Sequence, residues 1–229
     1  MLKPYQQIPI HECGENLIRI PKRDFAFVTP HPYQKLGAPY GNISPYWVRQ
    51  SVLTALQQAQ KKLETQSPGW KIQIFDAYRP LAVQQFMVDH TFQALRQQSS
   101  DLSDQEIAQR VTQFWAKPSA NPQTPPPHST GAAVDITLVN AKGETVNLGG
   151  EIDEISARSY PNFYQDKATF TGQLYHQRRE LLKNIMTTAG FQQHPAEWWH
   201  FSLGDQMWAW LKDQGSSQTE TIAYYGRVE

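Results

Sequence analysis

The stretch HSTGAAVDITLV, residues 128–139, leads from a polar loop into an apolar run. Its second part, residues 133–139, alternates and is rich in β-branched side chains, which is typical of a strand. Asp135 and Thr137 face one side of that strand, and the aliphatic residues between them face the other. The stretch therefore predicts a sheet strand that carries a carboxylate, with the imidazole of His128 on the loop before it.

A second stretch, EWWH, opens a predicted strand over residues 197–202. Residues three apart on a strand point to opposite faces, so Glu197 and His200 reach one metal only with help. A bulge, a strand end or the long glutamate side chain would supply that help. On spacing alone, an aromatic edge strand, with Trp198 and Trp199 packed on a core, explains the same residues somewhat better.

Together the two stretches supply two imidazoles, one carboxylate for a metal and a second carboxylate that can act as a base. Two histidines and one acid, with a coordination position left for water, are typical of a catalytic zinc site. The small residues of 131–133 would let the backbone fold close to a metal. The pair of His128 and Asp135 is weak by itself, because a histidine in a loop is more often solvated or capping.

A third motif, DAYRP at residues 76–80, follows a predicted strand. An arginine just past a strand end can project into a cleft, where its guanidinium stabilises the negative charge that builds up on a carbonyl oxygen. An ordinary ion pair between Asp76 and Arg79 at a strand-to-helix turn is the alternative explanation.

Helix patterns dominate the first half of the chain and strands the second half, which predicts an α+β fold. We expect a single domain over residues 1–229, with helices packed around a central antiparallel sheet that bears a zinc site. Residues 1–46 are expected to be an extended arm with loops, and residues 204–229 a C-terminal tail. Helices are predicted from Ser44-Pro45 to about 64, from Pro80, from the capping box at 103–106, over 174–189 and over 205–211. Strands are predicted at 25–28, 71–76, 133–139 and 197–202, with a hairpin arm at 144–148.

The composition excludes several classes of protein. The 229 residues carry 21 basic and 21 acidic side chains, so the net charge gives no argument for nucleic acid or a membrane surface as a partner. Cys13 is the only cysteine, which excludes an intrachain disulfide and a site with several thiolate ligands. No basic segment with a following apolar run opens the chain, and no stretch is long enough to span a bilayer, so we expect a cytoplasmic protein.

The three motifs in this order resemble the zinc D-alanyl-D-alanine dipeptidase family, peptidase family M15. That family carries Tyr-Arg-Pro, then Ser-x-His-x-x-Gly-x-Ala-x-Asp, then Glu-x-x-His. The matching residues here begin at Tyr78, His128 and Glu197, and the resemblance extends from about residue 15 to 203. The segment GGEIDE, residues 149–154, is similar to the family's glycine-rich acidic segment.

The resemblance implies one zinc ion per chain, held by His128, Asp135 and His200. It implies Glu197 as the general base and Arg79 as the group that stabilises the tetrahedral intermediate. Asp153 is implied as the partner of the substrate's ammonium group. Tyr78, Ser129 and Trp198 are expected to line the substrate site. The family serine two positions before the first zinc histidine is Pro126 here, which puts the dipeptide preference in doubt.

The implied activity is hydrolysis of the D-alanyl-D-alanine dipeptide to two D-alanines, so the expected partner is a small dipeptide. A DD-carboxypeptidase or a peptidoglycan endopeptidase of the same fold is the nearest alternative. A zinc-binding module without catalysis is the alternative from another class, but it would need neither Glu197 nor Arg79. The sequence makes no prediction of the oligomeric state.

Overall fold

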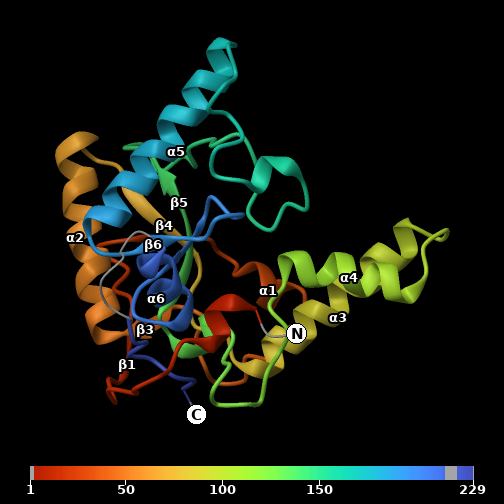
Figure 1. Ribbon diagram of the computed structural model, residues 1–229. Coiled ribbons are helices and arrows are strands. Elements are labelled where there is room, and N and C mark those ends of the chain that lie inside the picture. The colour runs from red at the N-terminus through yellow and green to blue at the C-terminus, as the bar shows by residue number, and fades with distance from the viewer. Residues whose placement is uncertain (1–2, 215–220, 229) are drawn as a thin grey trace.

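A five-stranded sheet lies at the centre of the protein, with helices around it (Figure 1). The computed structural model describes residues 3–214 and 221–228. The architecture confirms the predicted α+β class. Neighbouring strands run antiparallel, as expected, except that β2 and β4 are parallel. In spatial order the strands are β2 (Ala26–Phe27), β4 (Lys71–Asp76), β5 (Ala133–Val139), β7 (His200–Ser202) and β6 (Gln192–Gln193).

Strand β5 is central, and its register places the polar groups of three strands together. Asp135 lies opposite Asp76 of β4 on one side and opposite His200 of β7 on the other. Side chains that lie directly opposite each other in a sheet point to the same face. A register shift between Ile74 and Asp76 moves Asp76 off the face that Ile74 occupies, as β-bulges commonly do. The sheet therefore collects three polar side chains on one face.

The opposite face of β4 and β5 packs against two long helices, α2 (Gln50–Gln66) and α5 (Phe170–Thr188). The strands present an unbroken apolar row to these helices. The same core contains aliphatic side chains of both helices at helical spacing. The fully buried members of this core include Ile72, Ile74, Val134, Ile136 and Leu138 of the strands and Leu56, Leu63, Leu182 and Ile185 of the helices.

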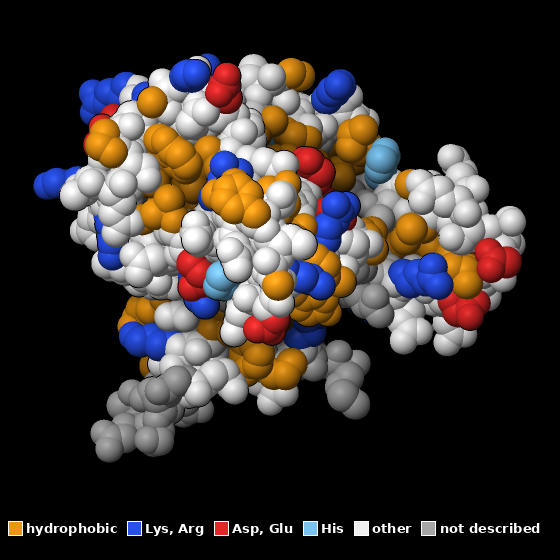
Figure 2. Space-filling model, turned by 90° about the horizontal axis from the view of Figure 1, so that it is seen from above, with side chains coloured by type: hydrophobic (Ala, Val, Ile, Leu, Met, Phe, Trp, Pro, Cys, Tyr) orange, Lys and Arg blue, Asp and Glu red, His pale blue; other side chains and the backbone are white. Residues whose placement is uncertain are grey.

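A second apolar cluster holds the helical hairpin of α3 (Leu81–Gln98) and α4 (Asp104–Phe114) together. This hairpin projects sideways from the sheet in Figure 1 and forms the lobe at the right of Figure 2. The predicted capping box is present, because the Ser103 side chain accepts from Glu106 N and the Glu106 side chain accepts from Ser103 N. Two short helices are also present, α1 (Pro32–Lys35) and the 3-10 helix η2 (Pro127–Thr130).

Described residues of the stretches that were expected to be an arm, 1–46, and a tail, 204–229, contact one another. The 3-10 helix η1 (Pro4–Gln7) packs on α6 (Gln206–Asp213), and Ile10 forms a parallel bridge with Ala223. Strand β1 (Leu17–Arg19) pairs with β3 (Trp47–Arg49) in a separate two-stranded sheet. Expectations for residues 1–2, 215–220 and 229 lie outside the described residues.

Buried Arg49 links both ends to the middle of the chain. Its guanidinium donates to the carbonyl oxygens of Thr130 at 2.8 Å and Gly226 at 3.1 Å, and it pairs with Glu12 at 3.1 Å. One side chain thus connects the N-terminal segment, the C-terminal segment and η2. Because these donors are charged, each bond is stronger than a neutral one.

Four predicted element boundaries were wrong. Strand β3 occupies residues 47–49, so α2 begins at Gln50 and not after Ser44-Pro45. The hairpin arm at 144–148 is reduced to one bridge, between Val139 and Thr145. Helix α5 begins four residues earlier than predicted, because Thr169 caps it by accepting from Gly172 N. Strand β7 begins at His200, so Glu197 precedes the strand.

No helix within the described part of the chain is long and apolar enough to cross a membrane. Basic and acidic side chains are interspersed on the face that Figure 2 shows. A surface with mixed charge gives no extended field of one sign for an anionic polymer. A further 3-10 helix, η3 (Ala157–Ser159), lies between β5 and α5.

The core assignment predicts the effect of a cavity in α2. Leu56→Ala should lower the free energy of unfolding by about 2 to 5 kcal/mol, because it removes a fully buried side chain between the helix and the sheet. Gln58→Ala, on the exposed side of the same helix, should change that free energy by less than about 0.5 kcal/mol. Urea denaturation measures both; equal effects of the two substitutions would contradict the assignment.

Candidate functional site

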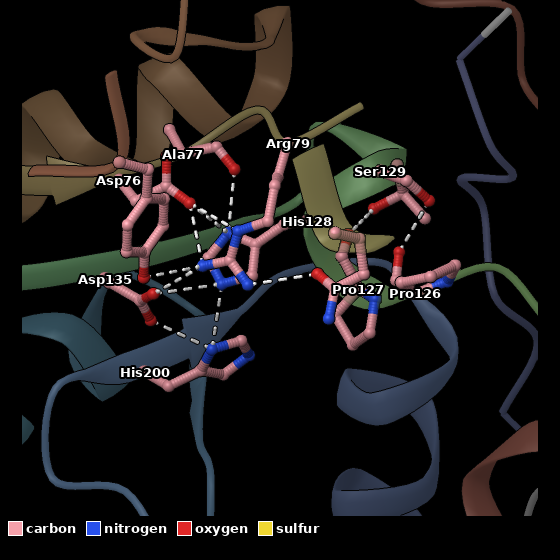
Figure 3. A network of polar contacts seen from close by, with 12 residues as sticks. Asp76, Ala77, Arg79, Pro126, Pro127, His128, Ser129, Asp135 and His200 are labelled. Atoms are coloured by element: carbon pink, nitrogen blue, oxygen red, sulfur yellow. Dashed lines mark hydrogen bonds and ion pairs between the residues drawn. The ribbon is translucent and has the colours of Figure 1, made fainter. Parts of the chain in front are cut away.

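Three side chains from three elements converge at the polar end of the sheet. His128 of η2, Asp135 of β5 and His200 of β7 each offer a ligand atom, and these atoms all lie within 4.8 Å of one another. His128 Nε2 is 3.2 Å from both His200 Nδ1 and Asp135 Oδ2, and His200 Nδ1 is 3.0 Å from Asp135 Oδ1. Figure 3 shows both imidazoles turned toward the Asp135 carboxylate.

The second nitrogen of each imidazole has a partner that fixes the ring. His128 Nδ1 lies 2.7 Å from the Ala77 carbonyl oxygen, so it carries the proton and leaves the Nε2 lone pair free. Ser202 Oγ donates its hydrogen to Asp205 at 2.9 Å, so it acts as the acceptor toward His200 Nε2, 3.4 Å away. The ring proton of His200 is therefore on Nε2. Partners of this kind orient metal-binding histidines.

The resulting centre consists of two lone pairs and a carboxylate that face one another. Burial alone would raise the pKa of Asp135, but His128 and His200 hold it well below its usual range, so the group is ionised at neutral pH. At such short separations the three groups need a cation or a shared proton between them, and positive charge at that position keeps the pKa of Asp135 low. Two nitrogens and one oxygen match the ligands of Zn²⁺, and three protein ligands leave a position for water.

Gly131 makes the turn from η2 into β5 possible. Its φ of 71° lies in the left-handed region, and a Cβ atom there would come within 2.3 Å of Leu17 Cδ2. The sequence suggested that the small residue allows a close approach to a metal. The structure instead shows a close approach to the side chain of β1.

Glu197 lies in the turn before β7, and this placement resolves the problem of opposite strand faces. One of its carboxylate oxygens is 3.7 Å from His200 Nδ1. Burial raises the pKa of Glu197 to about 7, although His200 acts in the opposite direction. A carboxyl group with a pKa near neutrality suits a general base that must also return its proton.

Arg79 is held beside the centre by hydrogen bonds on every nitrogen. Nε donates to Asp76 at 2.8 Å, and Nη1 donates to Gln84 at 3.1 Å. Nη2 donates to the Tyr33 hydroxyl and to Asp135 Oδ2, both at 3.2 Å. Because a guanidinium has five N–H donors, one N–H of Nη1 remains without a partner among the described residues.

Asp76 itself is fully buried and orients this arginine. Its carboxylate also lies 3.1 Å from His31 Nε2 and accepts from the Tyr40 hydroxyl at 3.1 Å. Burial acts to raise the pKa of Asp76, but Arg79, His31 and His128 together outweigh burial, and the pKa is lowered. The ion pair between Asp76 and Arg79, which was the alternative explanation of the DAYRP motif, is therefore present, and it is part of the site.

Asp153 marks the other end of the site. It accepts from the Tyr33 hydroxyl at 2.7 Å, and burial raises its pKa to about 7. It is also the one non-glycine residue with positive φ, 64°, within residues 3–214 and 221–228. Aspartate tolerates this conformation better than most residues, and such backbone geometry clusters at functional sites.

Tyr33 is a site residue that the sequence did not suggest. It is buried, it bonds both Arg79 and Asp153, and Arg79 Cζ lies 5.0 Å from the ring centroids of both Tyr33 and Trp115. Cation–π contacts with these two rings help to fix the guanidinium. No motif surrounds Tyr33, so only the tertiary structure could reveal its position.

A cavity of about 90 Å³ joins these groups. The six residues for which chemical roles were expected all line it, namely Arg79, His128, Asp135, Asp153, Glu197 and His200.

The structure does not bring the other three expected residues to this cavity. The Tyr78 hydroxyl donates to the Val228 carbonyl oxygen at 3.4 Å, and Ser129 Oγ donates to that of Pro126 at 2.7 Å. Trp198 is buried and lines a separate cavity with Gln73 and Thr137, and its neighbour Trp199 lines the cavity of the site instead.

Comparison with known proteins gives consistent results. The family model described as D-ala-D-ala dipeptidase, Peptidase_M15, matches residues 27–219. A protein of Synechocystis sp. named D-alanyl-D-alanine dipeptidase is 51% identical over 241 residues, which cover 100% of this chain and 98% of that protein. A protein of the same name from Enterococcus faecalis is 28% identical over 163 residues, 68% of this chain and 72% of that one.

One solved structure that is similar to this chain is VanYB in complex with D-Alanine-D-Alanine. It has a TM-score of 0.44 and 15% identity, and the match covers 69% of this chain and 71% of that chain. The LdcB LD-carboxypeptidase has a TM-score of 0.47 and 15% identity, and the match covers 90% of this chain and 76% of that chain.

The network around Arg79 predicts graded losses of stability. Asp76→Asn should lower the free energy of unfolding by about 3 kcal/mol, because it breaks a buried ion pair. Tyr40→Phe, which removes one hydrogen bond to the same carboxylate, should cost about 1 kcal/mol. Urea denaturation at pH 7 measures both, and equal losses would show that the charge of Asp76 is unimportant.

The loss caused by Asp76→Asn should also depend on pH. The pKa of Asp76 is lowered in the folded protein, so its ionised form contributes stability above its ordinary value of 3.8. That contribution disappears as the pH falls through the lower folded pKa. The difference between Asp76→Asn and the unsubstituted protein should therefore shrink when denaturation is repeated at about pH 3.

Proposed function

The chain belongs to the D-Ala-D-Ala dipeptidase family of M15 peptidases and is a hydrolase, and on this premise we propose that it cleaves D-alanyl-D-alanine to two D-alanines with one zinc ion per chain. The observation that carries the proposal is the convergence of His128, Asp135 and His200 beside Glu197 and Arg79 in one small cavity. The relative that is 51% identical over the whole chain bears the name of this activity.

His128, Asp135 and His200 would hold the zinc ion through two nitrogens and one carboxylate oxygen. When bound, zinc supplies positive charge that activates water at neutral pH and polarises a carbonyl group. The protein's part is to keep Asp135 ionised and both rings in the correct tautomer, which the partners Ala77 and Ser202 do.

Glu197 accepts the proton of the attacking water and returns it to the amine that leaves. Its position 3.7 Å from a ligand nitrogen and its raised pKa support both halves of this role. The remaining N–H of Arg79 is available for the oxygen on which negative charge develops. The other donors of Arg79 are occupied, so the guanidinium needs no reorganisation during the reaction.

Asp153 binds the free ammonium group of the dipeptide. Its carboxylate lines the cavity and has a hydroxyl partner, Tyr33, but no cation of the described residues lies within ion-pair distance. A substrate ammonium group would give this partly buried carboxylate a cationic partner. Cleavage of longer peptides would distinguish this activity from the carboxypeptidase and endopeptidase alternatives.

Two substitutions separate metal binding from proton transfer. Glu197→Ala should keep the zinc and lower the turnover of D-Ala-D-Ala by about 100- to 10,000-fold, the range expected for the loss of a general base. His200→Ala should lose the zinc itself. Zinc content by atomic absorption and turnover by release of D-alanine measure the two effects.

The control for these substitutions is Glu180→Ala, at an exposed position of α5, which should keep both zinc and turnover. Near-normal hydrolysis by Glu197→Ala would exclude Glu197 as the base. Unaltered activity after zinc removal, or equally fast cleavage of long peptidoglycan stem peptides, would contradict the zinc dipeptidase itself.

The pKa of Asp153 predicts how substrate affinity depends on pH. The group is ionised above about pH 7 and protonated below, and only the ionised form attracts an ammonium group. KM for D-Ala-D-Ala should therefore rise as the pH falls from 8 to 6, by up to about tenfold per unit at the acid end. In Asp153→Asn, KM should be about 10- to 100-fold higher at pH 8 and independent of pH in this window. A pH-dependent KM in that variant would assign the titration to another group.

A further inference from the structure

Two basic side chains line the cavity, Arg79 and Lys3, and they differ in their partners. The guanidinium of Arg79 is held by Asp76, Gln84 and Tyr33 and touches Asp135. The ammonium of Lys3 forms no ion pair with a carboxylate of residues 3–214 or 221–228. Lys3 is therefore the cation of the lining that can accept an anionic group from a ligand.

Lys3 reaches the cavity because the N-terminal segment is fastened over it. The side-chain nitrogen of Gln206 in α6, Nε2, donates to the Ile8 carbonyl oxygen at 2.6 Å and to the Gln123 carbonyl oxygen at 3.0 Å. The Lys3 backbone N–H donates to Gln6 Oε1 at 2.9 Å, which closes η1 at its first turn. Tyr5 of the same helix is buried and also lines the cavity. The segment thus forms one wall of the site and presents Lys3 at its rim.

Charges of both signs line the cavity. Asp153 accepts from the Tyr33 hydroxyl, which also accepts from Arg79. Lys3 lines the same cavity as Glu197 and His194. A cavity whose lining holds both an acidic group and a basic group can bind the two charged ends of a zwitterionic dipeptide.

We propose that the Lys3 ammonium binds the C-terminal carboxylate of the dipeptide, so that the N-terminal segment selects substrates with a free carboxyl end. This inference rests on the proposed function and adds the group that recognises the second charged end. With the amine at Asp153 and the carbonyl at the metal centre, the carboxylate needs a cation of the lining, and Lys3 is the one whose ammonium forms no ion pair with the described residues. Lys3 is a specificity-determining residue and takes no part in proton transfer.

The test compares D-Ala-D-Ala with its C-terminal amide, D-Ala-D-alaninamide, on the zinc-loaded protein. The unsubstituted protein should prefer the free acid. Lys3→Met should raise KM for the acid by about 10- to 100-fold with little change in kcat, as expected when a charge-assisted bond is lost. It should leave the amide almost unaffected, so that the preference disappears. Lys3→Arg should restore most of the preference, because it restores the positive charge.

Lys142→Met, in an exposed turn, is the matched control and should keep the preference of the unsubstituted protein. Zinc content and thermal midpoint should be the same in all variants. A Lys3→Met protein that still prefers the acid by the original factor would overturn the inference, since the carboxylate would then be bound elsewhere. Failure of the unsubstituted protein to cleave D-Ala-D-Ala would instead overturn the proposed function, so the two failures are distinguishable.

Discussion

The carboxylate of Asp135 is the group on which the site depends. One of its oxygens faces His200, and the other faces His128 and Arg79. The register of β5 between β4 and β7 fixes this position, because Asp135 lies opposite Asp76 on one strand and His200 on the other. A one-residue slip of either pairing would turn a ligand into the apolar core. The unbroken aliphatic row on the other face of β5 therefore secures the geometry of the polar face.

Four carboxyl groups lie close together here, and their surroundings divide them into two pairs. Asp76 and Asp135 have cationic or imidazole partners, which keep their pKa values low despite complete burial. Glu197 has only longer imidazole contacts, at 3.7 and 3.9 Å, Asp153 contacts the Tyr33 hydroxyl, and burial raises the pKa of each to about 7. In the proposed mechanism the first pair holds Arg79 and would hold a metal, and the second pair would exchange a proton and accept an ammonium group. Separation of pKa values by environment is a general way to assign different roles to similar groups.

The ends of the chain contribute to this centre although they are far from the motifs in sequence. Tyr33 of the N-terminal region bridges Arg79 and Asp153, and Lys3 and Tyr5 form a wall of the cavity. Arg49 fastens the N-terminal segment and residues near Gly226 to the helix that carries His128. The site is thus enclosed by segments that neither have a strong periodic pattern nor contain a known motif.

The sequence by itself determined the elements with strong local signals and identified the groups that are proposed to carry the chemistry. The alternation of residues 133–139 and the capping box at Ser103 predicted their elements correctly, because these patterns depend on neighbours within a few residues. The set of His128, Asp135, His200, Glu197, Arg79 and Asp153 came from spacing and family resemblance, and all six line one cavity. Tertiary structure decided the rest: β3 replaced the predicted start of α2 because it pairs with β1, and Glu197 left the strand because β7 begins only at His200. The places of Tyr33 and Lys3 in the cavity wall, and of Tyr78, Ser129 and Trp198 outside it, depend on contacts between residues far apart in the chain, which no local pattern encodes.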